Sequence, residues 1–127
     1  MIVVDASAAV LGLLNDGDAR ARLANEPLAV PHLVDSEIVQ AFRSQVHRGD
    51  VAAADAERAL DTWVRLGIQR VGLVGLLGRI WELRDNLSAY DASYVAVAEA
   101  LDCSLLTADA RLARAPGPDC PITVVTD

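Results

Sequence analysis

The sequence predicts an α/β fold, a three-layer α/β/α sandwich built around a central parallel sheet. Short apolar runs without polar alternation, which are typical of strands buried on both faces, recur along the chain. Longer segments with helical periodicity separate them. Strands that alternate with helices in this way are typical of βαβ units, whose strands are parallel. The 127 residues contain no linker, repeat or low-complexity segment, so we expect one domain over residues 1–127.

Five apolar runs have the length and composition of strands. The first is the β-branched run after Met1, and Pro31 closes the second. The predicted strands cover residues 2–4, 28–30, 68–71, 104–107 and 122–125.

Seven segments between and after these strands are predicted to be helical. They cover residues 6–14, 19–24, 34–48, 51–66, 73–85, 89–101 and 110–114. The turn-forming residues 15–18 separate the first two, and Gly49 stops the third. Gly75 and Gly78 weaken the fifth, because glycine costs about 1 kcal/mol relative to alanine inside a helix.

Two of these helices have a predicted core face. In helix 34–48 we expect that face to contain Ile38, Val39, Phe42 and Val46. In helix 89–101, for which Ser88 is the expected N-cap, the apolar residues at positions i, i+4, i+7 and i+11 are Tyr90, Tyr94, Val97 and Leu101.

The composition excludes several classes of protein. Hydrophobic residues make up 53% of the chain, which argues against disorder. The longest apolar run, 71–78, is too short to span a bilayer, so we expect no membrane segment. The amino terminus lacks the charged region of a signal peptide, and the predicted location is cytoplasmic.

Cys103 and Cys120 give no disulfide framework and are expected to be buried free thiols.

Four acidic residues stand out by their positions. Asp5 ends the first strand, and Asp109 follows the strand 104–107. Glu37 lies early in its helix, and Asp91 lies in the first turn of another. Each acid also has an alternative role that is purely structural. Asp5, Asp91 and Asp109 could cap helices, and Glu37 could be an ordinary surface residue. Ligands of open α/β sheets bind at the carboxyl ends of the strands, so all four acids can face one crevice.

Clustered carboxylates repel one another unless a cation neutralises them. Mg²⁺ or Mn²⁺ suits such a cluster, because a hard cation takes oxygen ligands and Mg²⁺ keeps several waters. The two cysteines lack zinc spacing, and His32 and His47 are isolated. A metal site of this kind supports hydrolysis of a phosphodiester, since the ion polarises the phosphate and activates the attacking water.

Three motifs carry a resemblance to a known family. The run Asp5-Ala6-Ser7 after a short strand resembles the start of a PIN domain, as does the glutamate shortly after Pro31. The stretch 90–99, followed by Leu-Leu-Thr-Ala-Asp at 105–109, is similar to the signature of bacterial VapC-type toxins. The resemblance covers nearly the whole chain. It implies a homodimeric, Mg²⁺- or Mn²⁺-dependent endoribonuclease that leaves 5′-phosphate and 3′-hydroxyl ends, together with a cognate VapB-type antitoxin encoded beside it.

The resemblance also assigns roles by position. Asp5, Glu37, Asp91 and Asp109 match the family's acidic quartet, which supplies the catalytic and metal-binding groups. Ser7 and Thr107 match the hydroxyl residues that support the quartet by hydrogen bonding. Gln40 departs from the asparagine that many members carry one turn after the glutamate, which puts the local geometry in doubt.

The charge pattern bears on the substrate. The net charge is −7, and all 11 basic residues are arginine. An RNA ligand would therefore need arginines locally, since phosphate contacts dominate nucleic-acid binding. The candidates are Arg43, Arg48, Arg111 and Arg114, for which pairing with nearby acids is the alternative.

Other functions compete with the nuclease. Haloacid-dehalogenase-type phosphatases, receiver domains and P-loop nucleotidases each need a lysine in the site, and the chain has none. A PIN-like scaffold that only binds RNA or a protein partner stays open, as does a nuclease directed at DNA. For the expected homodimer, the candidate interfaces are the apolar segment 71–81 and helix 51–66.

Overall fold

A five-stranded parallel sheet forms the centre of the protein in the computed structural model, which describes all 127 residues. The strands are β1 (Ile2–Val4), β2 (Leu28–Pro31), β3 (Ile68–Val71), β4 (Ser104–Thr107) and β5 (Ile122–Val124). Their order across the sheet is β3-β2-β1-β4-β5, and every neighbouring pair is parallel. The predicted strands are confirmed to within one residue. The chain's first strand therefore lies in the middle of the sheet.

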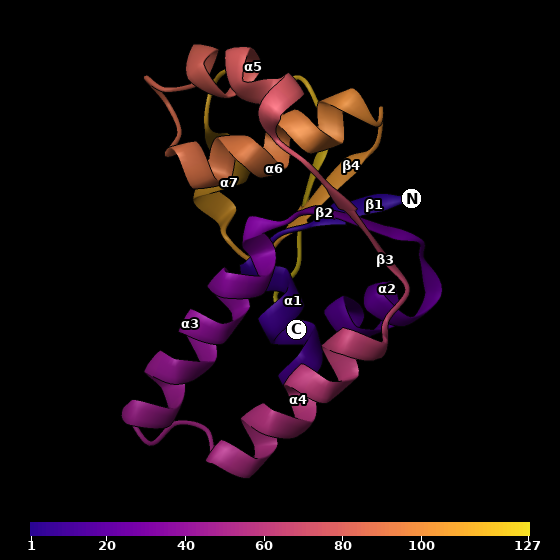
Figure 1. Ribbon diagram of the computed structural model, residues 1–127, viewed down its shortest axis with the longest axis vertical. Helices are drawn as coiled ribbons and strands as arrows, with labels where there is room; N and C mark the ends of the chain where they lie inside the picture. The colour runs from indigo at the N-terminus through magenta and orange to yellow at the C-terminus, as the bar shows by residue number, and fades with distance from the viewer.

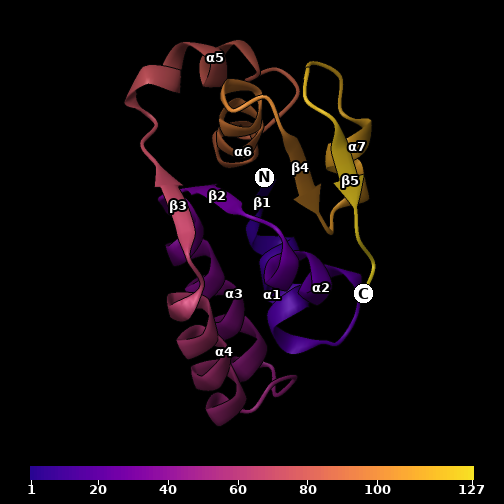
Figure 2. The ribbon, with the colours of Figure 1, turned by 90° about the vertical axis from the view of Figure 1, so that its right-hand side faces the viewer.

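Helices cover both faces of this sheet. They are α1 (Ala6–Leu14), α2 (Asp18–Asn25), α3 (Leu33–His47), α4 (Ala53–Arg65), α5 (Leu77–Glu82), α6 (Ala89–Ala100) and α7 (Ala110–Arg114), with a 3₁₀ helix, η1 (Val74–Leu76), before α5. Helices α5 and α6 lie on one side of the sheet, and α1 to α4 lie on the other (Figure 1 and Figure 2). The predicted α/β/α sandwich is confirmed. No helix has the length and apolar character needed to cross a membrane.

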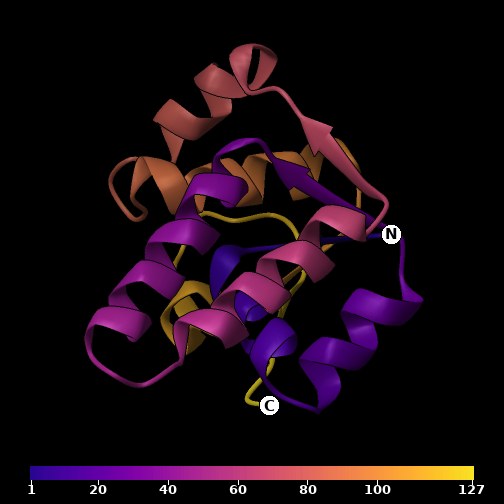
Figure 3. The ribbon, with the colours of Figure 1, turned by 60° about the horizontal axis from the view of Figure 1, so that its bottom comes forward.

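Helices α3 and α4 form an antiparallel hairpin that projects away from the sheet (Figure 3). A three-way contact fixes its base. Both Asp35 oxygens accept hydrogen bonds from Arg70 of β3, each at 2.7 Å, and the indole N–H of Trp63 donates to Asp35 at 2.8 Å. This bidentate pair joins α3, α4 and β3 two residues before Glu37, and so anchors the turn of α3 that carries Glu37.

Helix α6 is the most deeply buried helix. All residues from Ala92 to Ala98 are buried, because α6 packs on β1, β2 and β4 on one side and against α5 on the other. A helix without a polar face in its middle is typical of a buried element, and its small residues allow close approach to the sheet. Arg79 ties α5 to α6 through Glu99, with Nε–Oε1 and Nη2–Oε2 distances of 2.7 and 3.0 Å.

Three details of the prediction are wrong. The single helix predicted for 73–85 is a 3₁₀ turn followed by the short α5, which ends at Glu82. Val39 is 51% exposed, because the stripe through Val34, Ile38 and Phe42 already fills the interface of α3. Tyr90 is 65% exposed, since it precedes the part of α6 that the sheet and α5 enclose.

Candidate active site

The junction of β1 and β4 is the topological switch point of the sheet. From β1 the chain proceeds to β2 on one side, and from β4 it proceeds to β5 on the other. The loops that leave the two strands therefore diverge, and ligands of open α/β sheets bind at such a point. Asp5 directly follows β1, and Asp109 follows β4 by two residues.

Asp5 is held in place by three donors. Its side chain is buried, and its Oδ1 accepts hydrogen bonds from the Ser7 hydroxyl at 2.6 Å and the Ala8 amide at 2.9 Å. The Thr107 hydroxyl donates to the other oxygen, Oδ2. Asp5 is thus the N-cap of α1, as its structural alternative proposes, and it also bridges to β4. Both oxygens have a fixed orientation because donors reach them from two strand ends.

The same two hydroxyls fix the loop after β4. Ser7 Oγ accepts the amide of Ala108 at 2.9 Å, and Thr107 Oγ1 accepts the amide of Asp109 at 3.0 Å. Each hydroxyl therefore donates to Asp5 and accepts a backbone N–H from the loop that carries Asp109. Ser7 and Thr107 couple the position of one acid to the position of the other.

Glu37 has a partner that the sequence analysis missed. Tyr94 of α6 is almost fully buried, and its hydroxyl donates a hydrogen bond to Glu37 Oε1. We expected Tyr94 only as part of an apolar face. A buried tyrosine hydroxyl normally needs a polar partner, and this rule is the signal that could have found the pair.

Asp91 and Asp109 occupy helix N-termini. The amide of Asp91 donates to the Ser88 hydroxyl at 3.1 Å, so Ser88 caps α6 as predicted. Asp109 caps α7 by accepting the Arg111 amide at 2.9 Å, and the Arg111 guanidinium lies 3.2 Å from each of its oxygens. Asp109 is therefore paired with a cation, whereas Asp91 has no ion-pair partner within salt-bridge distance.

The pKa values of the four acids show that their charges influence one another. Burial raises the pKa of Asp5, Glu37 and Asp91. Negative neighbours raise each of these pKa values further: Asp109 acts on Asp5, Asp91 and Asp5 act on Glu37, and Asp5 and Asp109 act on Asp91. The pKa of Asp109 is lowered instead, by its hydrogen bonds from Arg111. Burial and mutual repulsion thus disfavour the charged forms of Asp5, Glu37 and Asp91, whereas Arg111 compensates the charge of Asp109.

This donor set has the chemistry of a hard-cation site. It offers carboxylates and hydroxyls with no soft ligand, and its like charges would be relieved by a divalent ion. No three His, Cys, Asp or Glu side chains lie close enough together to hold an ion between them. Since Mg²⁺ keeps several waters, carboxylates at this spacing fit an ion that they contact partly through water.

The candidate arginines fall into two groups. Arg111 and Arg114 lie on α7 beside the acids, and both lower the pKa of Asp109. Arg43 is exposed on α3, and Arg48 pairs with Asp50 at 3.0 Å at the far end of that helix. Arg48 is eleven positions from Glu37, a rise of about 16 Å along a helix. The α7 arginines are therefore the ones beside the acidic cluster.

Gln40 takes no part in the hydrogen bonds of the cluster. It is exposed on α3, and its amide donates to the Ser44 hydroxyl at 3.3 Å. Its departure from asparagine leaves the bonds of Asp5 and Glu37 intact.

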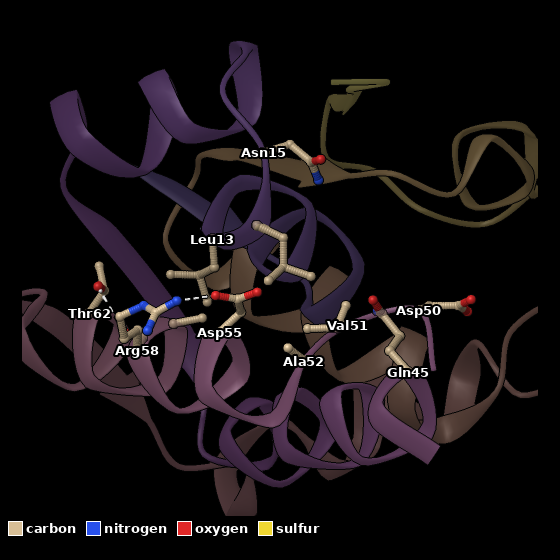
Figure 4. A pocket seen from close by; sticks show the side chains of 11 residues that line it. Leu13, Asn15, Gln45, Asp50, Val51, Ala52, Asp55, Arg58 and Thr62 are labelled. Carbon is tan, nitrogen blue, oxygen red and sulfur yellow. Dashed lines mark hydrogen bonds and ion pairs between the residues drawn. The ribbon is translucent and has the colours of Figure 1, made fainter. Parts of the chain in front are cut away.

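A large hollow lies elsewhere in the protein. It has a volume of about 650 Å³ and runs between the end of α1 and helix α4 (Figure 4). Leu13, Val51 and Ala52 contribute apolar surface, and the Asp55–Arg58 ion pair lies in its wall (Figure 4). None of the four acids lines it. The hollow and the acidic cluster therefore lie in different parts of the protein.

Comparison with known proteins identifies the class. Residues 2–118 match the family described as PIN domain. A crystal structure of a protein from Pyrobaculum aerophilum is similar in fold, with a TM-score of 0.67 and 28% identity, covering 95% of this chain and 81% of the other. VapC20 of Mycobacterium tuberculosis, described as a sarcin-ricin loop cleaving toxin, has a TM-score of 0.63 at 21% identity, covering 90% and 94% of the two chains. Fold and sequence both define PIN-domain proteins as the class.

Curated relatives narrow the assignment. A VapC ribonuclease of Mycobacterium bovis and ribonuclease VapC9 of Mycobacterium tuberculosis are each 62% identical over 125 residues, 98% of either chain. Ribonuclease VapC1 of Mycobacterium tuberculosis is 41% identical, covering 97% of this chain and 96% of its own. The chain therefore belongs to the VapC ribonucleases of the PIN domain family.

The raised pKa of Asp91 predicts how an Asp91→Asn variant responds to pH. Burial and repulsion outweigh the favourable position of this anion at a helix N-terminus. Without divalent metal, the variant should therefore have a higher free energy of unfolding than the wild type at pH 7. The gain should vanish below the ordinary aspartate pKa of 3.8, where the wild-type carboxyl is neutral in both folded and unfolded states.

Urea denaturation in a chelator at both pH values measures this difference. Asp61→Asn, the same substitution at an exposed position of α4, is the matched control and should change little. An Asp91→Asn protein that is less stable than the wild type at pH 7 would contradict the electrostatic interpretation.

Proposed function

We propose that this chain cleaves RNA as a metal-dependent endoribonuclease, and that it is the toxin of a type II VapBC toxin–antitoxin module. One observation supports the proposal: Asp5 and Asp109 follow the strands of the β1–β4 switch point, and the charges of Asp5, Glu37, Asp91 and Asp109 influence one another's pKa values. Membership of the VapC ribonucleases supports the choice of RNA. The proposed place of action is the cytoplasm, where RNA is available.

The metal we propose is Mg²⁺ or Mn²⁺. Asp5 and Asp91 would be its principal ligands, and Glu37 and Asp109 would complete the site directly or through water. When bound, the ion would polarise the phosphate and lower the pKa of the attacking water.

The protein's own contribution is preorganisation and proton transfer. The three donors on Asp5 hold its oxygens in one orientation, so little rearrangement is needed when a ligand arrives. Glu37 has a raised pKa, which suits acceptance of a proton from water, and Tyr94 holds its carboxylate in place. Ser7 and Thr107 act as positioning residues through Asp5 and the loop after β4.

The phosphate backbone of RNA would be held by arginine. Arg111 and Arg114 are the first candidates, because they lie on α7 next to Asp109. Arg43 and Arg48 would extend the contact along α3 towards a longer substrate. Arginines beside the site would then offset the acidic net charge where the phosphates bind.

The proposed protein partner is a VapB-type antitoxin encoded beside the toxin. Support comes from a crystal structure of VapBC2 from Rickettsia felis, bound to a DNA fragment from its promoter. The similar chain of that structure has a TM-score of 0.67 at 15% identity, covering 98% of either chain. The competing function is a PIN-like scaffold that binds RNA or protein without cutting, and the experiments below separate the two.

The first test measures metal binding and cleavage together. Asp91→Asn keeps the side-chain shape but removes a charge from the proposed ligand set. Added Mn²⁺ should raise the melting temperature of the wild type by mass action and should raise that of the variant much less. Cleavage of a labelled RNA should fall by orders of magnitude, whereas Asp61→Asn should match the wild type. An Asp91→Asn protein that cuts RNA at the wild-type rate would contradict the assignment of Asp91 as a metal ligand of the active site.

The second test examines toxicity. Expression of the chain alone in bacteria should arrest growth and protein synthesis, followed by culture density and incorporation of a labelled amino acid. Co-expression of the neighbouring small gene should relieve the arrest, and Asp91→Asn should not cause it. Normal growth with abundant soluble wild-type protein would count against a toxin.

We also propose a symmetric homodimer, formed by the apolar segment of η1 and α5. Val74, Leu77 and Trp81 are 87%, 57% and 67% exposed, which is high for a cluster of large apolar side chains. The Arg84 guanidinium lies 4.5 Å from the Trp81 ring and leaves this surface largely apolar. We prefer this surface to α4, where Val64 is the one large hydrophobic that is strongly exposed.

Light scattering with matched variants tests the dimer. The wild type should have a dimer mass at micromolar concentration, and Leu77→Asp should shift it to a monomer. Val64→Asp on α4 should leave the dimer intact. A wild-type monomer, or a dimer that only Val64→Asp breaks, would refute the α5 interface.

A further inference from the structure

We propose that Cys103 and Cys120 form a redox-sensitive dithiol, which closes to an intramolecular disulfide when the protein meets a small-molecule disulfide oxidant. The pair lies at the amino-terminal edge of β4 and β5, opposite the edge that carries the acidic cluster. Both cysteines are free thiols, as predicted, but both are half-buried rather than buried.

The register of the sheet brings the two residues side by side. In the β4–β5 ladder, Leu105 pairs with Ile122, and Thr107 pairs with Val124. Neither cysteine belongs to a strand, but this register, continued by two residues towards the amino ends, would set Cys103 beside Cys120. The amide of Leu105 donates to the Pro121 carbonyl at 2.9 Å, so the ladder is still hydrogen-bonded next to the pair.

This placement suits a disulfide. Neighbouring strands lie about 4.7–4.9 Å apart, and disulfides form at Cα separations of about 4.4–6.8 Å. Paired residues of parallel strands present their side chains on the same face of the sheet. The register therefore satisfies both the spacing and the direction that the bond requires.

A shared hollow is the second, independent observation. Cys103 and Cys120 both line a hollow of about 250 Å³, with Ala98 and Glu99 of α6 and Asp119 of the preceding loop. The hydrogen bond from the Asp119 amide to Glu99 Oε2, at 2.8 Å, holds this loop against α6. The two thiols thus face the same space and are both accessible from it.

The environment of the two thiols determines how readily they are oxidised. Burial raises the pKa of Cys120 to about 11, and the charges of Glu99, Cys103 and Asp119 contribute. Burial also raises the pKa of Cys103. Since the thiolate is the reactive form, the pair should oxidise slowly and respond to sustained rather than brief exposure to oxidant.

The reaction consists of two exchange steps. One cysteine thiolate attacks a sulfur of the small disulfide, which breaks the S–S bond, forms a mixed disulfide and releases one small thiolate. The second cysteine thiolate attacks the protein sulfur of that mixed disulfide, closes the Cys103–Cys120 bond and releases the second small thiolate. The protein loses two electrons and two protons, and both end on the two released thiols.

Closure would constrain a segment that belongs to the candidate active site. The loop between the two cysteines contains β4, Thr107, Asp109 and helix α7. A cross-link stabilises mainly by restricting the unfolded chain, and a loop of this size should raise the melting temperature by roughly 10 °C. The proposal does not depend on nuclease activity, because the bond and its effect on stability are measured directly.

The test uses the reduced full-length protein, incubated with oxidised glutathione, blocked with iodoacetamide and analysed by intact and peptide mass spectrometry. We expect a product in which no disulfide joins two chains and each chain is lighter by two hydrogens. We also expect a peptide cross-linked through Cys103 and Cys120, and a higher melting temperature that dithiothreitol reverses. Cys103→Ser and Cys120→Ser should each yield only a mixed disulfide with glutathione.

Three outcomes would overturn the proposal. They are a wild-type protein that stops at the mixed disulfide, one whose cysteines bond between two chains, and one whose thiols stay unreacted while those of the urea-unfolded chain oxidise. A melting temperature that does not change after closure would refute the predicted constraint on the segment from β4 to α7.

Discussion

The hydrogen bonds that Asp5 accepts from Ser7 and Thr107 are the contact on which the rest of the site depends. The bond from Thr107 joins the ends of β1 and β4 across 102 residues of sequence, at the point where the order of the strands reverses. Removing a carboxylate from water is costly, and these donors offset part of that cost. The same hydroxyls accept the amides of the next loop, so the position of Asp109 follows from the burial of Asp5.

The carboxylates of the candidate site reduce the stability of the folded protein around them. Three of its four acids have raised pKa values, so their charged forms are disfavoured by the fold that presents them. Two ion pairs outside the cluster anchor helices that bear candidate site residues, with Asp35–Arg70 holding α3 and Arg79–Glu99 joining α5 to α6. Both pairs lower the pKa of the carboxyl involved, and both hold a helix that bears a site residue. Carboxylates with raised pKa values, carried on firmly anchored helices and strands, are typical of functional sites.

The strands could be predicted because they depend on local patterns, and so could the positions of Asp5 and Asp109 after two of them. Uninterrupted β-branched runs mark buried parallel strands, and an acid directly after such a run marks its carboxyl end. Local patterns do not pair Tyr94 with Glu37 or Trp63 with Asp35, since these residues are 57 and 28 positions apart. The need of a buried tyrosine hydroxyl for a polar partner indicates that a contact exists, but not which residue makes it. The exposed Tyr90 shows the limit of periodicity, which describes a helix face but not where the neighbouring layer ends.

The central position of β1 has a consequence for synthesis on the ribosome. The strand that emerges first, Ile2–Val4, has β4 as one neighbour, and β4 is among the last segments to be made. Asp5 cannot acquire its contact with Thr107, which lies 102 residues further along the chain, until Thr107 has left the exit tunnel. A parallel sheet with such non-local pairing forms late. A nascent chain therefore lacks an assembled site until the segment from β4 to Asp109 has emerged.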